Sequence, residues 1–307
     1  MPDYDVLVVG SANADLTVRV DRRPGPGETV TGGDLVESAG GKGANQAAAA
    51  ARLGARTALL ARVGDDAYGQ LLLDAQRRAG TDVRHVLVER GARTGTATIV
   101  VGPDGDNAIV VSPGANARLS PADVTAARAL VAASAVVSLQ LEVPARTVRA
   151  AATVAAEEGA RVVFNPSPAP ERIDEQVLAV ADPLVVNEHE ARQLSQGEGN
   201  TAEEWAAALR HCGARSVVVT LGAEGALVLG ADGRRPVRVP GVPAEVVDTT
   251  GAGDAFTGAL AVRLAGGASL EEAARYAVRV GAAAVTRPGA QPSYPTAREL
   301  DRQPATG

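Results

Sequence analysis

Cysteine and histidine are scarce in this sequence of 307 residues, and its 30 basic residues are outnumbered by 36 acidic ones. Cys212 is the only cysteine, which excludes an intramolecular disulfide and a metal site built from several thiolates. The three histidines, at 85, 189 and 211, lack the spacing of a zinc motif. The formal net charge of −6 argues against nucleic acid or an anionic membrane as a partner, since both select a basic surface.

Long hydrophobic runs are also missing. No apolar segment reaches the roughly 20 residues needed to cross a bilayer. Asp3 and Asp5 stand where a secretory signal would carry basic residues. We therefore expect a soluble, cytoplasmic protein with no membrane partner. The hydrophobic content of 46% is enough to build a large core.

Short β-branched runs alternate with alanine-rich helical stretches along most of the chain. Apolar runs without strict alternation, separated by helices, indicate a mostly parallel sheet covered on both faces. We expect a three-layer α/β/α fold in a single domain, 1–307, because no linker or internal repeat is visible. The expected strands are 6–10, 57–62, 135–139, 161–165, 184–187 and 216–221, and the expected helices are 44–53, 68–79, 121–132, 144–157, 202–211, 252–264 and 270–285.

Two β-like segments, at about 16–38 and 94–112, interrupt this alternation. The second predicts a hairpin with its turn at 103–107, where Pro, Asp, Gly and Asn cluster. The pair is consistent with a small sheet that stands off the main domain and acts as a lid. A purely structural edge hairpin fits the same pattern.

A glycine-rich motif occupies Gly40–Gln46, between a β-like segment and a helix. Its glycines permit positive φ and a close approach of the backbone to a ligand, and Lys42 and Asn45 add polar groups. It is not a Walker P-loop, because the glycines are too close together and neither Ser nor Thr follows the lysine. A tight structural turn remains an equally good interpretation.

The segment Asp248–Asp254, with sequence DTTGAGD, carries more information. Gly251, Ala252 and Gly253 precede a helix, and converging amides at a helix start bind anions. Asp254 then falls in the first helical turn, beside that anion site. The arrangement suits phosphoryl transfer, with the amides stabilising phosphate charge and Asp254 accepting a hydroxyl proton. Taken alone, a capping aspartate in a glycine-rich loop explains it as well.

Polar residues also follow several other expected strands, at the sheet edge where α/β proteins bind ligands. These groups together predict a site at that edge. They are Ser11–Asp15, Gln140–Glu142, Asn187–Glu190 and Thr220–Gly225.

The chain resembles the ribokinase/PfkB family of carbohydrate kinases from about Asp5 to Tyr294. The first family signature is similar to Gly40–Gly64, and the second to Asp248–Ala259. Further similarities lie at 13–15, 26–30, 140–142 and 289–293. The resemblance implies a Rossmann-like three-layer fold with a β-sheet lid, which in this family also forms a homodimer.

The resemblance also implies roles for individual residues in the ATP-dependent phosphorylation of D-ribose at its 5-hydroxyl. Asp254 would be the general base, with Gly251, Ala252 and Gly253 as anion hole. The sugar would be held by Asn13, Asp15, Gly41, Lys42, Asn45, Glu142 and Asp254. ATP would contact Asn187, Thr220, Leu221, Gly222, Ala223, Glu224, Gly225, Gly253 and Val278. Glu190 would bind Mg²⁺ through water, and a potassium ion would take oxygens of Asp248, Thr250, Ala284, Arg287, Gly289 and Ser293.

Two alternatives remain. A related kinase could act on adenosine, a keto-deoxy sugar acid or a phosphosugar. The first would need aromatic residues to stack a base, and the others additional cations, and neither is evident in the expected pocket. The second alternative is a catalytically silent sugar- or nucleotide-binding regulator on the same fold, which would have no need of Asp254.

Overall fold

The computed structural model describes residues 2–104, 106–233 and 235–302. In this part of the chain a large sheet has the order β13-β12-β11-β10-β9-β8-β1-β4-β5, and a small sheet has the order β3-β2-β6-β7. The large sheet comprises β1 (Tyr4–Val9), β4 (Thr57–Gly64), β5 (Val86–Glu89), β8 (Ser134–Leu139), β9 (Arg161–Phe164), β10 (Ala181–Asn187), β11 (Val217–Thr220), β12 (Gly225–Leu229) and β13 (Val237–Pro240). Its strands are parallel from β5 to β11, and β12 and β13 run antiparallel to their neighbours.

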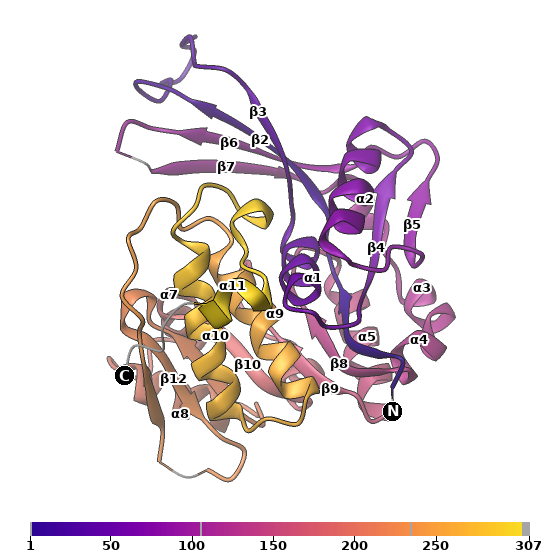
Figure 1. Cartoon of the computed structure of the whole chain (residues 1–307), viewed down its shortest axis with the longest axis vertical. Coiled ribbons are helices and arrows are strands. Elements are labelled where there is room, and N and C mark those ends of the chain that lie inside the picture. The colour runs from indigo at the N-terminus through magenta and orange to yellow at the C-terminus, as the bar shows by residue number, and fades with distance from the viewer. Residues whose placement is uncertain (1, 105, 234, 303–307) are drawn as a thin grey trace.

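Helices cover both faces of the large sheet, and Figure 1 shows how they are arranged. They are α1 (Lys42–Arg52), α2 (Ala67–Ala79), α3 (Pro121–Ala126), α4 (Arg128–Ala132), α5 (Ala145–Glu157), α6 (Glu175–Leu178), α7 (Glu188–Leu194), α8 (Ala202–His211), α9 (Ala252–Ala265), α10 (Leu270–Ala284) and α11 (Ala297–Arg302). Short 3₁₀ turns form η1 (Gly114–Arg118), η2 (Gly222–Glu224) and η3 (Gln291–Ser293).

The apolar strands explain why both faces are covered. In β1, Val6 and Val8 pack into a core with α1, α2, α9 and α10, whereas Leu7 and Val9 pack into a second core with α3, α4, α5 and α8. Successive side chains of a strand point to opposite faces, so an uninterrupted apolar run needs a helical layer on each side. The expected three-layer α/β/α fold is confirmed.

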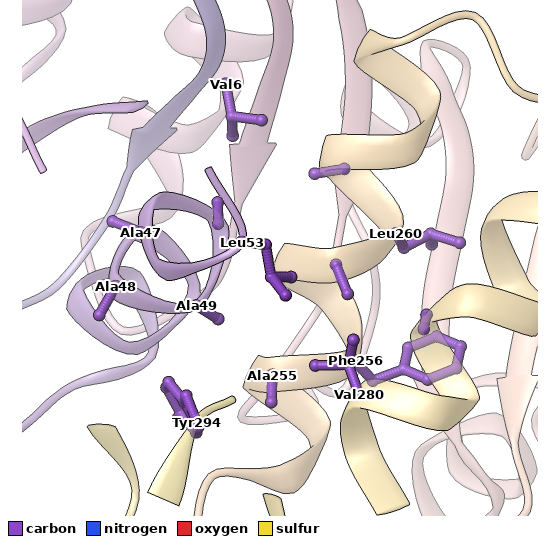
Figure 2. Packing of buried hydrophobic residues seen from close by; sticks show 14 of the residues in the cluster. Val6, Ala47, Ala48, Ala49, Leu53, Ala255, Phe256, Leu260, Val280 and Tyr294 are labelled. Carbon is purple, nitrogen blue, oxygen red and sulfur yellow. The ribbon is translucent and has the colours of Figure 1, made fainter. Parts of the chain in front are cut away.

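Close packing of α1 against α9 positions the two glycine-rich motifs. Figure 2 shows Ala47, Ala48 and Ala49 of α1 in the same core as Ala255 and Leu260 of α9. A Cβ atom at Gly258 of α9 would lie 2.7 Å from the carbonyl oxygen of Gln46 and 2.9 Å from Ala49 Cβ. Small residues at this contact therefore let the two helices approach closely.

The small sheet consists of β2 (Asn13–Arg19), β3 (Val36–Gly40), β6 (Gly95–Val101) and β7 (Asn107–Ser112). It projects at the top of Figure 1, and its strands β2 and β3 contact α2. The predicted second sheet is therefore present, although its first strand begins at Asn13, and 20–35 contains no strand. The predicted hairpin turn includes residue 105, which lies outside the described residues.

Several expected boundaries were wrong. The helix expected at 121–132 is divided at Ala127, and α1 begins at Lys42 rather than at 44. Strands β5, β12 and β13 and the short helices α6, α7 and α11 were not expected. In the described residues, no helix is both long and apolar enough to cross a membrane.

Candidate active site

Asp254 lies at the centre of a polar cluster between α1 and α9. It occupies the first turn of α9, and only 7% of its surface is exposed. Its Oδ2 accepts a hydrogen bond from Asn45 Nδ2 at 3.0 Å, and its Oδ1 accepts one from Gln46 Nε2 at 3.1 Å. Both donors belong to the first signature, so the two motifs meet at this carboxylate.

The start of α9 has the geometry of an anion site. Its N-cap, Gly251, has φ of 74° and contributes no side-chain cap. The first amides of a helix have no intrahelical acceptor, and the helix dipole favours negative charge there. The Ala252 amide already donates to the Thr249 carbonyl at 3.2 Å, whereas the amides of Gly251 and Gly253 donate to no acceptor in the described residues.

The two glycines of this turn differ in their surroundings. A Cβ at Gly251 would clash with Tyr294 Oη and lie 2.7 Å from Ala290 Cβ, and its positive φ also disfavours a side chain. Tyr294 Oη donates to the Gly251 carbonyl at 3.1 Å. A Cβ at Gly253 would meet nothing within 4 Å among the described residues. Gly251 is thus required by the fold, while Gly253 faces open space.

A second carboxylate, Glu142, organises the neighbouring polar residues just beyond β8. Its Oε2 accepts hydrogen bonds from Ser11 Oγ at 2.6 Å, Lys42 N at 3.0 Å and Asn13 Nδ2 at 3.4 Å. Asn116 Nδ2 donates to Asn13 Oδ1 at 2.7 Å, which fixes the orientation of that amide. Asn13, Lys42 and Glu142 are therefore close together, as the sequence predicts.

Asp15 and Lys42 add opposite charges to the cluster. Burial, and then the charges of Glu142 and Asp254, raise the pKa of Asp15 to about 7. Burial alone would lower the pKa of Lys42, but Asp254, Glu142 and Glu190 outweigh it and raise that pKa. Lys42 is thus a protonated ammonium group among carboxylates. Asp15 lies in β2 rather than in the expected loop, so the small sheet contributes directly to the cluster.

Gly41 joins the start of α1 to the backbone of the small sheet. It is the N-cap of α1 with φ of 88°, and a Cβ there would lie 2.7 Å from the Asn13 amide nitrogen. Only glycine tolerates both the conformation and the contact.

Among the residues expected to bind ATP, Asn187 ends β10, Thr220 ends β11, and the turn 221–225 leads from β11 into β12. Gly253 lies at the start of α9, and Val278 is buried on α10. Asn187 and Glu190 form a capping box at the start of α7, in which Asn187 Oδ1 accepts from Glu190 N and Glu190 Oε2 accepts from Asn187 N. The charge of Glu190 is one of those that raise the pKa of Lys42 against the effect of burial, so the start of α7 is electrostatically coupled to the cluster. Gly222, Ala223 and Glu224 are exposed, whereas Leu221 and Gly225 are buried.

The two loops expected to hold a monovalent cation are bonded to each other. Asp248 Oδ1 accepts from Thr250 N at 2.9 Å and its Oδ2 accepts from Gly289 N at 2.8 Å. Although burial opposes ionisation, these hydrogen bonds lower the pKa of Asp248. No three His, Cys, Asp or Glu side chains of the described residues gather to hold a metal ion. A cation here would depend on backbone carbonyls, and Ala284 supplies one at the end of α10, where the helix dipole favours cations.

Sequence reasoning missed the residues that support the cluster. Gln46, Gln140 and Gln291 stood within the quoted motifs but had no assigned role, and Asn116 and Tyr294 were not considered. All five are buried. The available signal was a glutamine within an apolar helical stretch or just after an apolar strand. Such an amide is expected to be buried, and a buried amide needs a hydrogen-bond partner.

Known proteins resemble this chain along nearly its whole length. The model of the pfkB family carbohydrate kinases matches residues 3–297. A ribokinase of Mus musculus is 37% identical over 300 residues, covering 96% of this chain and 93% of the mouse protein. A deoxyribokinase of Salmonella typhi is 34% identical over 300 residues, covering 97% of each protein.

The fold agrees with this similarity. The structure of Arabidopsis thaliana ribokinase complexed with ribose and ATP matches with a TM-score of 0.89, at 34% identity and over 97% of each chain. The two signature motifs also meet in space, at Asp254. The chain belongs to the pfkB family of carbohydrate kinases.

Proposed function

We propose that this kinase transfers the γ-phosphoryl group of ATP to the 5-hydroxyl of D-ribose. The observation that carries the proposal is the position of Asp254, a buried carboxylate held by two amides beside the open N-terminus of α9. A proton acceptor next to an anion site is what a hydroxyl-to-phosphate transfer requires. The ribokinase of Mus musculus and the ribose-bound structure support ribose as the acceptor.

The proposed step moves one proton and one phosphoryl group. Asp254 takes the proton of the ribose 5-hydroxyl while the oxygen of that hydroxyl forms a bond to the γ-phosphorus of ATP. The bond between the γ-phosphorus and the bridging oxygen breaks, and that oxygen keeps the electron pair and leaves with ADP. The amides of Gly251 and Gly253 stabilise the charge on the transferred group. Ala252 joins them once its amide leaves the Thr249 carbonyl. Lys42 contributes a fixed positive charge nearby.

The sugar lies between the small sheet and α1 in this proposal. Asn13, Asp15 and Glu142 accept or donate hydrogen bonds to its hydroxyls, and Lys42 and Asn45 do so from α1. The backbone of Gly41 approaches closely because it has no side chain. A site with both donors and acceptors recognises a small polyhydroxylated ligand by hydrogen bonding rather than by apolar area.

ATP lies over the ends of β10 and β11 in this proposal. The turn of Thr220, Leu221, Gly222, Ala223, Glu224 and Gly225 and the side of Val278 form its nucleotide site, and Asn187 lies near the phosphates. Glu190 suits Mg²⁺ held through water, because only its Oε2 accepts a hydrogen bond from the described residues. When bound, Mg²⁺ supplies charge neutralisation at the phosphates.

A monovalent cation, with potassium as the expected ion, suits the paired loops at 248–250 and 284–293. Asp248, Thr250, Ala284, Arg287, Gly289 and Ser293 would provide its oxygens. The bridging of these loops by the Asp248 carboxylate supports this assignment. When bound, the cation supplies positive charge behind the start of α9.

The small sheet serves as a lid and as the interface of a homodimer in this proposal. Strand β7 is exposed along its whole length, and it presents Ile109, Val110 and Val111, of which Val110 is 71% exposed. Leu35 and Val36 are also exposed at the opposite edge of the sheet. Apolar residues on an unpaired edge are typical of an interface with another chain.

Adenosine is a weaker candidate substrate on aromatic grounds. Tyr294 lies beside Gly251 but is fully buried, so its ring cannot stack on a base. Tyr68 does reach the small sheet, because its hydroxyl donates to Glu37 at 2.9 Å. One aromatic ring therefore stands closer to the site than the sequence indicated, which makes a direct comparison of substrates necessary.

An ATP-consumption assay over several acceptors tests the proposal. We expect ribose to give the highest kcat/KM among ribose, deoxyribose, adenosine, fructose 6-phosphate and keto-deoxygluconate. A strong preference for another acceptor would reject ribose while leaving the kinase chemistry intact. Ligand binding without ATP consumption for any acceptor would favour a silent regulator.

A further inference from the structure

Five buried glutamine and asparagine amides stand behind Asp254 in two separate relays. The first starts at Gln46, whose Nε2 donates to Asp254 Oδ1 at 3.1 Å. The Oε1 of Gln46 accepts from Gln140 Nε2 at 2.6 Å and from Ser138 Oγ at 2.8 Å. Two donors at this oxygen leave the amide a single orientation, with its nitrogen toward Asp254.

The second relay reaches Asp254 from the opposite side. Asn45 Nδ2 donates to Asp254 Oδ2, and Asn45 Oδ1 accepts from Gln291 Nε2 at 3.1 Å. Gln291 Oε1 in turn accepts from Gln76 Nε2 at 3.2 Å. Each amide is therefore oriented by the next one, from α2 through η3 to α1.

These side chains are buried so deeply that the bonds restrict their conformations. Gln46 is 0% exposed, Gln76 is 2% exposed, and Gln291 and Asn45 are each 7% exposed. A buried amide that loses its partner is costly, so the amides that are hydrogen-bonded in these relays resist a change of orientation. The outer oxygens of the relays, Gln76 Oε1 and Gln140 Oε1, have no hydrogen-bond partner among the described residues. Gln291 also lies between Gly289 and Ser293, so the second relay connects the loop at 285–293 with the carboxylate.

We propose that Gln46 and Gln291 are positioning residues that hold the carboxylate of Asp254 in one orientation through these two relays, an inference that rests on the proposed role of Asp254 as base. Neither residue needs to touch the sugar or ATP. Without Gln291, the Asn45 amide can rotate and present its oxygen to Asp254. Without Gln46, one carboxylate oxygen loses its donor.

Other charged and titratable groups surround Asp254. Burial lowers the pKa of Lys42 in α1, and the charge of Asp254 raises it. Asp15 of β2 is a neighbouring acid. Burial and then the charge of Asp254 raise the pKa of Tyr294. The charge of Glu142 raises the pKa of both Asp15 and Lys42. None of these groups changes in the variants proposed below, so a difference between variants and wild type reports on the amides.

The test uses Gln46→Met and Gln291→Met, which keep side-chain length but remove the amide. We expect kcat with ribose to fall roughly tenfold in each, with KM changed less than about threefold, because orientation of a general base contributes to the step rather than to binding. Thr147→Val is the matched control, since it removes a buried hydrogen bond to the Leu119 carbonyl far from Asp254. It should leave both constants within about twofold of wild type.

A second readout needs no substrate. In ligand-free protein at a single pH, carboxyl NMR of ¹³C-labelled aspartate, assigned with Asp254→Asn, should show a displaced Asp254 carboxyl resonance in both methionine variants, because the hydrogen bonds to this carboxylate change. The resonance should not move in Thr147→Val. If wild type phosphorylated no acceptor, the proposed function would fail, yet the NMR measurement would still test the relays. An unmoved resonance in both variants, or an equal displacement in the control, overturns the inference.

Discussion

The two glycines at the start of α9 predict opposite effects of the same substitution. Gly251→Ala introduces a Cβ at positive φ that clashes with Tyr294 and crowds Ala290. The left-handed conformation costs about 1–2 kcal/mol for alanine, and overpacking adds about 1–3 kcal/mol. We expect the free energy of unfolding to fall by about 2–5 kcal/mol.

Gly253→Ala adds the same atom where no described residue lies within 4 Å. Alanine is favoured over glycine in a helix, so we expect stability to be unchanged or to rise by about 0.5 kcal/mol. The new methyl group would nevertheless occupy space that we assign to the transferred phosphoryl group. Because anion-hole contacts contribute about 10²–10³-fold to kcat, displacement of the phosphoryl group by this methyl group should reduce kcat at least tenfold.

Urea denaturation and steady-state kinetics on the two variants separate these effects. Gly251→Ala should lose stability, and Gly253→Ala should lose kcat without losing stability. A Gly253→Ala enzyme with wild-type kcat would refute the placement of the phosphoryl group at the start of α9.

Three further predictions concern pH, assembly and ions. Burial raises the pKa of Asp15 to about 7 in the folded protein, against 3.8 for an ordinary aspartate such as that of the unfolded chain. Between pH 3.8 and 7 the folded protein therefore keeps the Asp15 proton while the unfolded chain loses it. The free energy of unfolding falls as pH rises through this range, by at most about 4 kcal/mol. Asp15→Asn should flatten this part of a stability–pH curve from urea titrations, and an equally steep curve would contradict the assignment. Val110→Lys on β7 should yield monomers in sedimentation velocity. The control Val88→Lys, at another exposed valine on β5, should remain dimeric. Dimers in both variants would exclude this interface. Activity should be highest in K⁺ and lower in Na⁺ or tetramethylammonium, and equal rates in all three would argue against the cation site.

The large sheet was predictable because its strands are short apolar runs that need burial on both faces. β10 was expected to start at Leu184, yet the strand begins at Ala181 and includes Pro183. Proline donates no hydrogen bond to a ladder, which makes such a start hard to infer. The division at Ala127 was also hidden, since alanine favours a continuous helix.

The candidate catalytic motif was visible in the sequence, but the residues that support it were not. Asp254 and the glycines before it are adjacent in the chain, so a local pattern reveals them. Gln46, Gln140 and Gln291 come from three distant segments, and their hydrogen bonds form only when α1 packs beside the end of β8 and against η3. Asp15 was predicted to belong to the site, but its place in β2 was not, because pairing within the small sheet depends on distant strands.

Asp254→Asn is the sharpest test of Asp254 as the proton acceptor. The substitution keeps the shape of the side chain, although the new amide can accept a hydrogen bond from only one of Asn45 and Gln46, so stability is measured in parallel. We expect calorimetry to show ribose and ATP binding close to wild type, and kcat to fall by at least the roughly 10²-fold typical of general-base loss. A variant that binds both ligands and phosphorylates ribose at a near-normal rate would contradict this role.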